Sequence, residues 1–179
     1  VTDPWYSETF KVQISSEQAG KVNFSNTKTG FMMATSVGGV STGFRGDFFV
    51  IDDPLSVPQG DSAVDRATAI RWFTETVPTR LNDLDESAIV VIAQRIHEED
   101  IPGVALERGY EGLVLPMEYE KRRHCTTSIG WSDPRKEEGE LMWPERFSRG
   151  AVEQMKNPDT GLGPYACAAQ LQQSPVPRK

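Results

Sequence analysis

The sequence has 179 residues, of which 37% are hydrophobic and 25% are charged, as is typical of one globular domain and not of a disordered chain. Its 19 lysines and arginines stand against 26 aspartates and glutamates, a formal net charge of −7, which argues against a free-standing DNA-coating protein because phosphate contacts need clustered cations. The longest apolar run, Ala88–Ala93, is far shorter than the roughly 20 residues of a membrane-spanning helix, so we expect no membrane partner.

The first part of the chain is predicted to form short strands that end in a glycine-rich loop. Apolar and polar residues alternate over 10–14 and over 22–24, which predicts two half-buried strands. A third strand is expected over 31–35. Four glycines then fall within 38–47, and glycine clusters of this kind mark loops.

A strand–helix–strand unit is predicted next. Phe48–Ile51 and Ala88–Ala93 are compact apolar runs, typical of strands buried on both faces of a parallel sheet. Between them, apolar residues recur every three or four positions from Ala63 to Val77, which predicts a helix that Pro78 bends or ends. Such a crossover makes the two strands parallel. The residues that follow each strand should therefore meet at one edge, where open α/β sheets bind ligands.

The remainder is predicted to be less regular. We expect a short helix over 98–108 and a third parallel strand over 112–116. From about Tyr119 the sequence becomes charged and irregular, with a helix from the capping Ser148 to Lys156 and a last helical segment over 165–173. This part is interpreted as a subdomain packed against the sheet.

The residues that follow the two apolar strands carry the strongest indication of chemistry. Asp52 and Asp53 follow the first strand, where P-loop ATPases hold Mg²⁺ through one acid and place a second acid beside the attacking water. Mg²⁺ prefers hard oxygen ligands and keeps several waters, so one carboxylate and a neighbour are sufficient. Gln94 and Arg95 follow the second strand, where a polar side chain of a nucleotide-dependent motor senses the γ-phosphate. The alternatives are a cap or turn for the acids, and a strand cap and surface ion pair for Gln94 and Arg95.

Other polar clusters are weaker candidates. His97–Asp100 is not an H-E-x-x-H zinc motif because Ile101 stands four residues after the histidine, and a solvated helix start is expected instead. Residues 121–123 and 137–140 are expected to be exposed charge, and His124 a surface histidine. The two cysteines lack C-x-x-C spacing, which favours structural thiols in a reducing compartment.

A phosphate-binding loop is missing from the sequence. No G-x-x-x-x-G-K-[ST] occurs, and the single Gly-Lys pair, Gly20-Lys21, is followed by Val22. Without that loop nothing in the sequence cradles the β- and γ-phosphates of ATP. A complete ATPase is therefore not expected in this chain.

Seven segments lie in order along the chain between about Thr35 and Pro177. Taken together they form a more specific pattern than any single segment does. They are VGGVSTGFRGD, FFVIDDP, RWFTETVPTRLND, AIVVIAQRIHEEDIPG, LVLPMEYE, GELMWPERF and GPYACAAQLQQSPVP. Together they resemble the large terminase subunit of tailed double-stranded DNA bacteriophages, the motor that packages viral DNA into proheads. The resemblance implies an α/β fold, namely part of a P-loop NTPase core (RecA-like, ASCE) with a parallel sheet, and a small lid subdomain.

The resemblance also implies roles for the residues after the strands. Asp52 is similar to the Walker B acid that binds Mg²⁺ through water and so holds ATP. Asp53 stands where many terminases carry a catalytic glutamate, which leaves a shorter side chain to orient the water. Gln94 lies in the counterpart of the coupling motif and is expected to read the nucleotide state. Arg95 beside it and Arg45 in the glycine-rich loop are expected to contribute to the nucleotide site, Arg45 towards phosphate or a neighbouring subunit.

By the same resemblance, residues 1–118 correspond to the second half of the ATPase core, 119–168 to the lid, and 169–179 to a linker toward a nuclease domain that is missing from this chain. The implied function is ATP hydrolysis that drives double-stranded viral DNA into the prohead. The expected partners are that DNA, the portal protein, the small terminase subunit and further copies of the chain in a ring. The expected location is the host cytoplasm, at the portal.

Two other functions remain open on the sequence. The chain resembles part of a motor that lacks its phosphate-binding loop, so it also fits a non-enzymatic binding module derived from a terminase, which would dock on a portal or on an intact motor. A small phosphohydrolase that uses Asp52 and Asp53 as a metal pair is the other enzyme class. It needs further metal ligands from distant segments, and the sequence indicates none.

Overall fold

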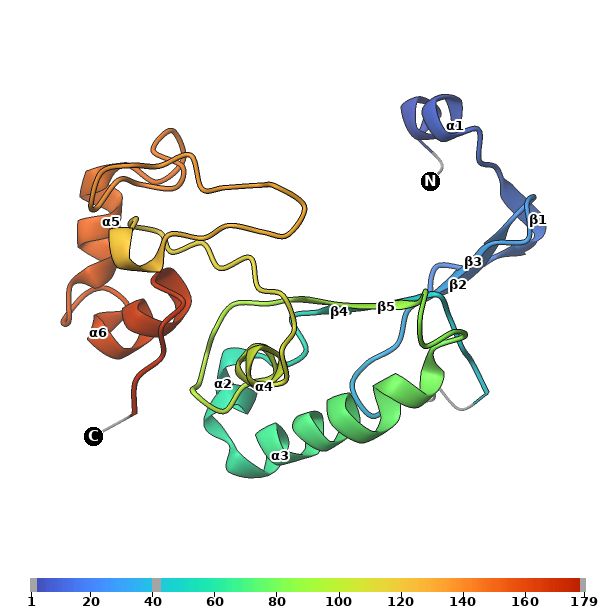
Figure 1. Ribbon diagram of the computed structural model, residues 1–179, viewed down its shortest axis with the longest axis horizontal. Helices are drawn as coiled ribbons and strands as arrows, with labels where there is room; N and C mark the ends of the chain where they lie inside the picture. Colours follow the sequence, from blue (N-terminus) through green and yellow to red (C-terminus); the bar gives the residue numbers. More distant parts are fainter. Residues whose placement is uncertain (1–2, 40–42, 178–179) are drawn as a thin grey trace. The chain divides into compact units, whose positions relative to one another are not determined.

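The computed structural model describes residues 3–39 and 43–177, and the chain divides into two compact units, Val1–Phe44 and Arg45–Lys179 (Figure 1). The predicted boundary between residues 118 and 119 lies inside the second unit. Residues 40–42 of the predicted glycine-rich loop and 178–179 of the predicted linker lie outside the described residues. Within the described ranges, no helix is long and apolar enough to cross a bilayer.

The first unit is a short helix followed by an antiparallel three-stranded sheet. Helix α1 (Pro4–Phe10) is followed by β1 (Ile14–Ala19), β2 (Asn23–Asn26) and β3 (Phe31–Met33), paired in the order β1-β2-β3. The predictions of strands at 22–24 and 31–35 are confirmed in their main parts.

The strand predicted at 10–14 is wrong, because residue 10 ends helix α1 and only residue 14 belongs to β1. The local reason lies upstream. Proline occupies the first turn of α1, and the Asp3 carboxylate accepts hydrogen bonds from the backbone N–H of Trp5 (2.9 Å) and Tyr6 (3.4 Å). Both features favour a helix start.

The second unit contains the predicted strand–helix–strand unit. Strands β4 (Phe48–Asp52) and β5 (Ala88–Ile92) pair in parallel, in register from Phe48 opposite Ala88 to Asp52 opposite Ile92. The structure is therefore a mixed helix–strand fold with a small parallel sheet, which is compatible with the α/β class. The prediction that these two runs are neighbouring parallel strands is confirmed.

Short helical segments form the connection from β4 to β5. They are α2 (Val57–Asp61), α3 (Ala63–Arg71), the π-helical turn η1 (Trp72–Thr76) and the 3₁₀ turn η2 (Val77–Arg80). The predicted helix from 63 to 77 is confirmed as one continuous helical stretch, and Pro78 falls in the 3₁₀ turn that ends it, as expected of a residue without a backbone N–H.

The sheet is buried on one face, not on both as predicted. Ile51 is 3% exposed and Phe49 lies against the ring of Trp72, with 5.9 Å between ring centroids. On the opposite face Phe48 is 72% and Val50 58% exposed. Alternate side chains of a strand point to opposite faces, and the connecting helical segments cover only one of them. The compact apolar run indicated a strand correctly, but it does not show how many layers surround it.

The rest of the second unit is helical turns joined by long irregular segments. Its regular elements are α4 (Ile101–Glu107), the 3₁₀ turn η3 (Lys121–Arg123), α5 (Arg149–Lys156), α6 (Gly163–Ala166) and the π-helical turn η4 (Cys167–Leu171). The predicted helices over 98–108, 148–156 and 165–173 are confirmed with shifted ends. The strand predicted over 112–116 is wrong: Gly112 and Pro116 direct their carbonyls to the side chains of Cys125 and Arg135 instead of to a neighbouring strand.

A buried ion pair organises the part of the chain that the sequence marked as irregular and charged. Asp133 and Arg135 are 5% and 6% exposed, and the guanidinium donates from Nε to Oδ1 (3.0 Å) and from Nη2 to Oδ2 (2.7 Å). Its Nη1 donates to the carbonyl of Pro116 (2.7 Å), and its Cζ lies 5.4 Å from the ring centre of Tyr119. The pair therefore links residues 133–135 to the earlier segment 116–119.

This pair predicts a specific loss of stability in acid. Hydrogen bonds from Arg135 hold the pKa of Asp133 below its ordinary value of 3.8, so the stabilisation is complete above pH 4 and is lost as the pH falls through the lower pKa of the folded state. We expect the free energy of unfolding, measured with urea from pH 5 to pH 2, to fall steeply below pH 4. Asp133→Asn should be less stable at pH 5 and flatter below pH 4. Glu145→Gln, which changes an exposed carboxyl, is the control and should keep the wild-type slope; a wild-type slope in Asp133→Asn would contradict the expectation.

Candidate functional site

The carboxyl ends of β4 and β5 bring the sequence-predicted acids and Gln94 to one edge of the sheet. Asp52 is in register with Ile92, and the backbone N–H of Asp53 donates to the carbonyl of Ile92 (2.9 Å). Gln94 lies two residues beyond Ile92, the last residue of β5, and all three of these polar residues are exposed. The predicted convergence of the two strand ends is therefore observed, while the roles of the side chains stay predictions.

Asp53 has an unusual backbone conformation at this edge. Its φ of 41° lies in the left-handed region, which non-glycine residues adopt rarely and Asp and Asn more readily than others. The chain leaves the sheet there and enters α2 through Ser56, whose backbone N–H donates to the side chain of Gln59 (3.0 Å). Unusual backbone conformations of this kind concentrate at functional sites. Asp53 therefore lies at the bend where the chain leaves β4.

The turn that contains Arg95 is built around a carboxylate that sequence reasoning missed. Asp100, expected at a solvated helix start, is 1% exposed. Its Oδ1 accepts from Arg95 Nε (2.8 Å) and from the N–H of Gly103 (2.8 Å), the second bond capping α4. Its Oδ2 accepts from the N–H of Ile96 (2.9 Å) and of His97 (3.3 Å). The only sequence indication was an acid before Pro102, the usual place of a helix cap.

Glycine at position 103 is required by this arrangement. A Cβ at that position would lie 2.7 Å from Arg95 Nη2 and 2.7 Å from the carbonyl oxygen of Glu98. The same Nη2 donates to that carbonyl (3.2 Å). The guanidinium of Arg95 thus fills the space that a side chain at position 103 would need, and its hydrogen bonds stabilise the turn.

Arg45 does not join this edge. It is exposed and precedes β4, next to Gly46, which forms an isolated parallel bridge with Leu81. Arg45 therefore lies at the amino end of the strand, whereas Asp52 lies at its carboxyl end. The structure brings Asp52, Asp53, Gln94 and the Arg95 backbone together and leaves Arg45 apart from them.

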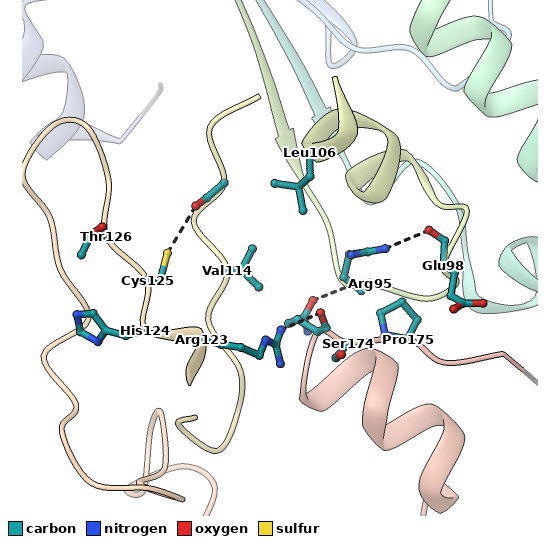
Figure 2. A pocket seen from close by; sticks show the side chains of 12 residues that line it. Arg95, Glu98, Leu106, Val114, Arg123, His124, Cys125, Thr126, Ser174 and Pro175 are labelled. Atoms are coloured by element: carbon teal, nitrogen blue, oxygen red, sulfur yellow. Dashed lines mark hydrogen bonds between the residues drawn. The ribbon is translucent and has the colours of Figure 1, made fainter. Parts of the chain in front are cut away.

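A cavity of about 550 Å³ lies beside the Arg95 turn (Figure 2). Its walls come from the Arg95 turn, α4, the segments 112–114 and 123–126, and the C-terminal residues 173–175. Asp52, Asp53 and Gln94 do not line it. Because Arg95 is paired with Asp100 (2.8 Å) and Arg123 with Glu120 (3.0 Å), the cavity offers no clear excess of positive charge for a phosphate.

His124 has partners that its spacing in the sequence did not indicate. It is exposed, as predicted. Its Nδ1 lies 2.7 Å from the Tyr119 hydroxyl and its Nε2 lies 2.9 Å from Ser132 Oγ. The hydroxyl of Tyr119 belongs to a side chain that is itself buried against Arg135, so His124 fastens the 125–132 hairpin to the buried ion pair.

The described residues do not form a complete metal site. Among them, no group of three or more His, Cys, Asp or Glu side chains is arranged to hold a metal ion. Mg²⁺ bound to nucleotides commonly uses only one or two carboxylates, with waters and phosphate oxygens as its other ligands. Asp52 and Asp53 can supply that share from the sheet edge.

Comparisons with protein-family models, with curated proteins and with solved structures find no match for this chain. The resemblance to the terminase large subunit therefore rests on the seven sequence segments, and the activity that it implies is a proposal.

Proposed function

We propose that this chain supplies the Walker B edge and the coupling edge of an ATPase that drives double-stranded DNA into viral proheads, as a large terminase subunit does. The observation that supports this best is the register of the parallel strands: Asp52 and Asp53 leave β4 at the edge to which β5 delivers Gln94. That arrangement is what a P-loop ATPase needs on the metal side of its nucleotide.

In this proposal each residue at the edge has one task. Asp52 holds Mg²⁺ through water, Asp53 orients the water that attacks the γ-phosphate, and Gln94 responds to the presence of that phosphate. Bound Mg²⁺ neutralises charge that develops on the phosphate oxygens. Arg95 contributes indirectly by stabilising the turn next to Gln94, because its guanidinium is paired with Asp100.

In this proposal the β- and γ-phosphates are bound by a phosphate-binding loop of another polypeptide segment, since this sequence contains none. The proposed partners are double-stranded viral DNA, the portal protein, the small terminase subunit and further copies in a ring, and the proposed place of action is the prohead portal in the host cytoplasm. That same lack supports the second candidate, a non-enzymatic module derived from a terminase, which would bind a packaging partner and have no affinity for Mg·ATP.

A Mn²⁺ titration of this chain tests the metal site. Mn²⁺ is a paramagnetic substitute for Mg²⁺, so we expect the NMR amide signals of residues 52–53 and 93–95 to broaden first. Asp52→Asn should weaken this binding roughly tenfold, the loss typical of removing a group that orients metal-bound water. The matched control is Asp85→Asn, an exposed acid in the loop before β5, which should change nothing. Broadening centred elsewhere, or equal broadening in Asp52→Asn, would count against the site.

A further inference from the structure

Two adjacent glutamines after η4 bind two different parts of the chain. The Gln173 side chain accepts a hydrogen bond at Oε1 from the backbone N–H of Arg95 (2.9 Å) and donates from Nε2 to the carbonyl of Gln170 (2.6 Å). The Gln172 side chain accepts from the N–H of Glu118 (3.0 Å) and donates to the carbonyl of the same residue (3.1 Å). One pair of residues thus contacts both the end of β5 and the segment before η3.

The backbone that presents these side chains is itself held. Arg123, which Figure 2 labels at the wall of the cavity, donates from Nη1 to the carbonyl of Gln172 (2.7 Å) and from Nη2 to the carbonyl of Gln173 (3.1 Å). Gln173 has a φ of 51°, in the left-handed region, which costs energy for a non-glycine residue and persists only where the surroundings enforce it. The two-pronged bond from Arg123 provides that enforcement.

Gln94 stands between two fixed points. On one side β5 is paired to β4 up to Ile92. On the other side, the backbone of Arg95 is bound by Gln173, while the Arg95 guanidinium is bound by Asp100. The amide of Arg95 is the first backbone donor after Gln94, so the Gln173 bond fixes the peptide that carries Gln94.

We propose that Gln173 is a positioning residue for Gln94, acting through the Arg95 amide. This inference rests on the proposed function, because it gives Gln94 the task of responding to the γ-phosphate. A group that stabilises a transition state must be held close to its working geometry. Gln173 supplies that hold from a position 79 residues further along the chain, next to the C-terminal segment.

The first measurement is hydrogen exchange at the Arg95 amide. Gln173→Met keeps the side-chain length and removes the acceptor, so exchange should rise by about tenfold, as loss of one partly buried hydrogen bond implies. Gln173→Glu keeps an acceptor and should restore protection. Gln170→Met is the matched control, since it changes a half-buried glutamine of η4 and leaves the backbone carbonyl that Gln173 bonds. Unchanged exchange in Gln173→Met overturns the proposal.

The second measurement is ATP turnover in a protein that joins this chain to a phosphate-binding loop. Gln173→Met should lower kcat about tenfold with KM for ATP unchanged, a split that general loosening of the fold would not give, and Gln173→Glu should recover it. Faster exchange at Arg95 with unchanged kcat, while Asp52→Asn is inactive, overturns the positioning role and leaves the proposed function intact. Turnover that survives in Asp52→Asn overturns the proposed function, and with it the role of Gln173 in hydrolysis, while the exchange result at Arg95 stands.

Discussion

Replacing Asp52 with asparagine should reduce ATP turnover at least about 100-fold in a packaging ATPase that contains this chain and a phosphate-binding loop, the order of loss seen when one group that stabilises transition-state charge is removed. Asparagine keeps the shape of the side chain and loses its negative charge, so the water shell of Mg²⁺ is no longer held at the edge of β4. Asp52 is exposed, and the fold should not change.

The control for this experiment is again Asp85→Asn, an exposed acid before β5, at the opposite end of the sheet. It should keep wild-type turnover. Circular dichroism and the urea midpoint of both variants should match the parent, which separates loss of chemistry from loss of fold. Full turnover in folded Asp52→Asn would exclude Asp52 as the Walker B acid.

Replacing Asp100 with alanine should lower the free energy of unfolding by about 3–5 kcal/mol, the cost of removing one partner from a buried ion pair. The carboxylate is 1% exposed and accepts from the Arg95 guanidinium and from the backbone N–H of Gly103, Ile96 and His97. Without it the α4 cap is lost and the arginine keeps a poorly solvated charge.

Urea unfolding at pH 7 measures this loss. Glu98→Ala removes an exposed acid two residues earlier and should change the free energy of unfolding by less than about 0.5 kcal/mol, as surface substitutions usually do. Asp100→Asn should fall between the two, because an amide oxygen still accepts while the charge is gone. A loss below about 1 kcal/mol in Asp100→Ala would show that the turn is held by other contacts.

The parallel pair β4–β5 was predictable because its information is local. Each strand is a compact apolar run, and the spacing between them is filled by residues of helical period, so chain order and handedness determine the pairing. Burial of both faces was not predictable from the same runs. Whether Phe48 and Val50 are covered depends on elements elsewhere in the chain. A run of apolar residues contains no information about those elements.

The part of the site that the sequence could not supply consists of contacts between distant residues. The position of Asp52, Asp53 and Gln94 at one sheet edge was predictable because each comes directly after a compact apolar run, while their roles stay predictions. Asp100 was missed because a cluster of acids usually indicates a solvated surface, and its burial depends on Arg95 turning back toward α4. The hydrogen bond from the Arg95 amide to the Gln173 side chain was also missed, because no sequence periodicity relates two residues so far apart.

The backbone at Asp53 also restricts how this position can vary. Its left-handed conformation favours Asp, Asn and Gly, whereas other residues accept it only at a steric cost. A glutamate would carry a longer side chain and would meet a steric cost in this backbone conformation. Aspartate tolerates this backbone conformation and also carries the carboxylate that the proposed function needs. Sequence drift at this position should therefore pass through Asn or Gly, unless the exit from β4 is rebuilt at the same time.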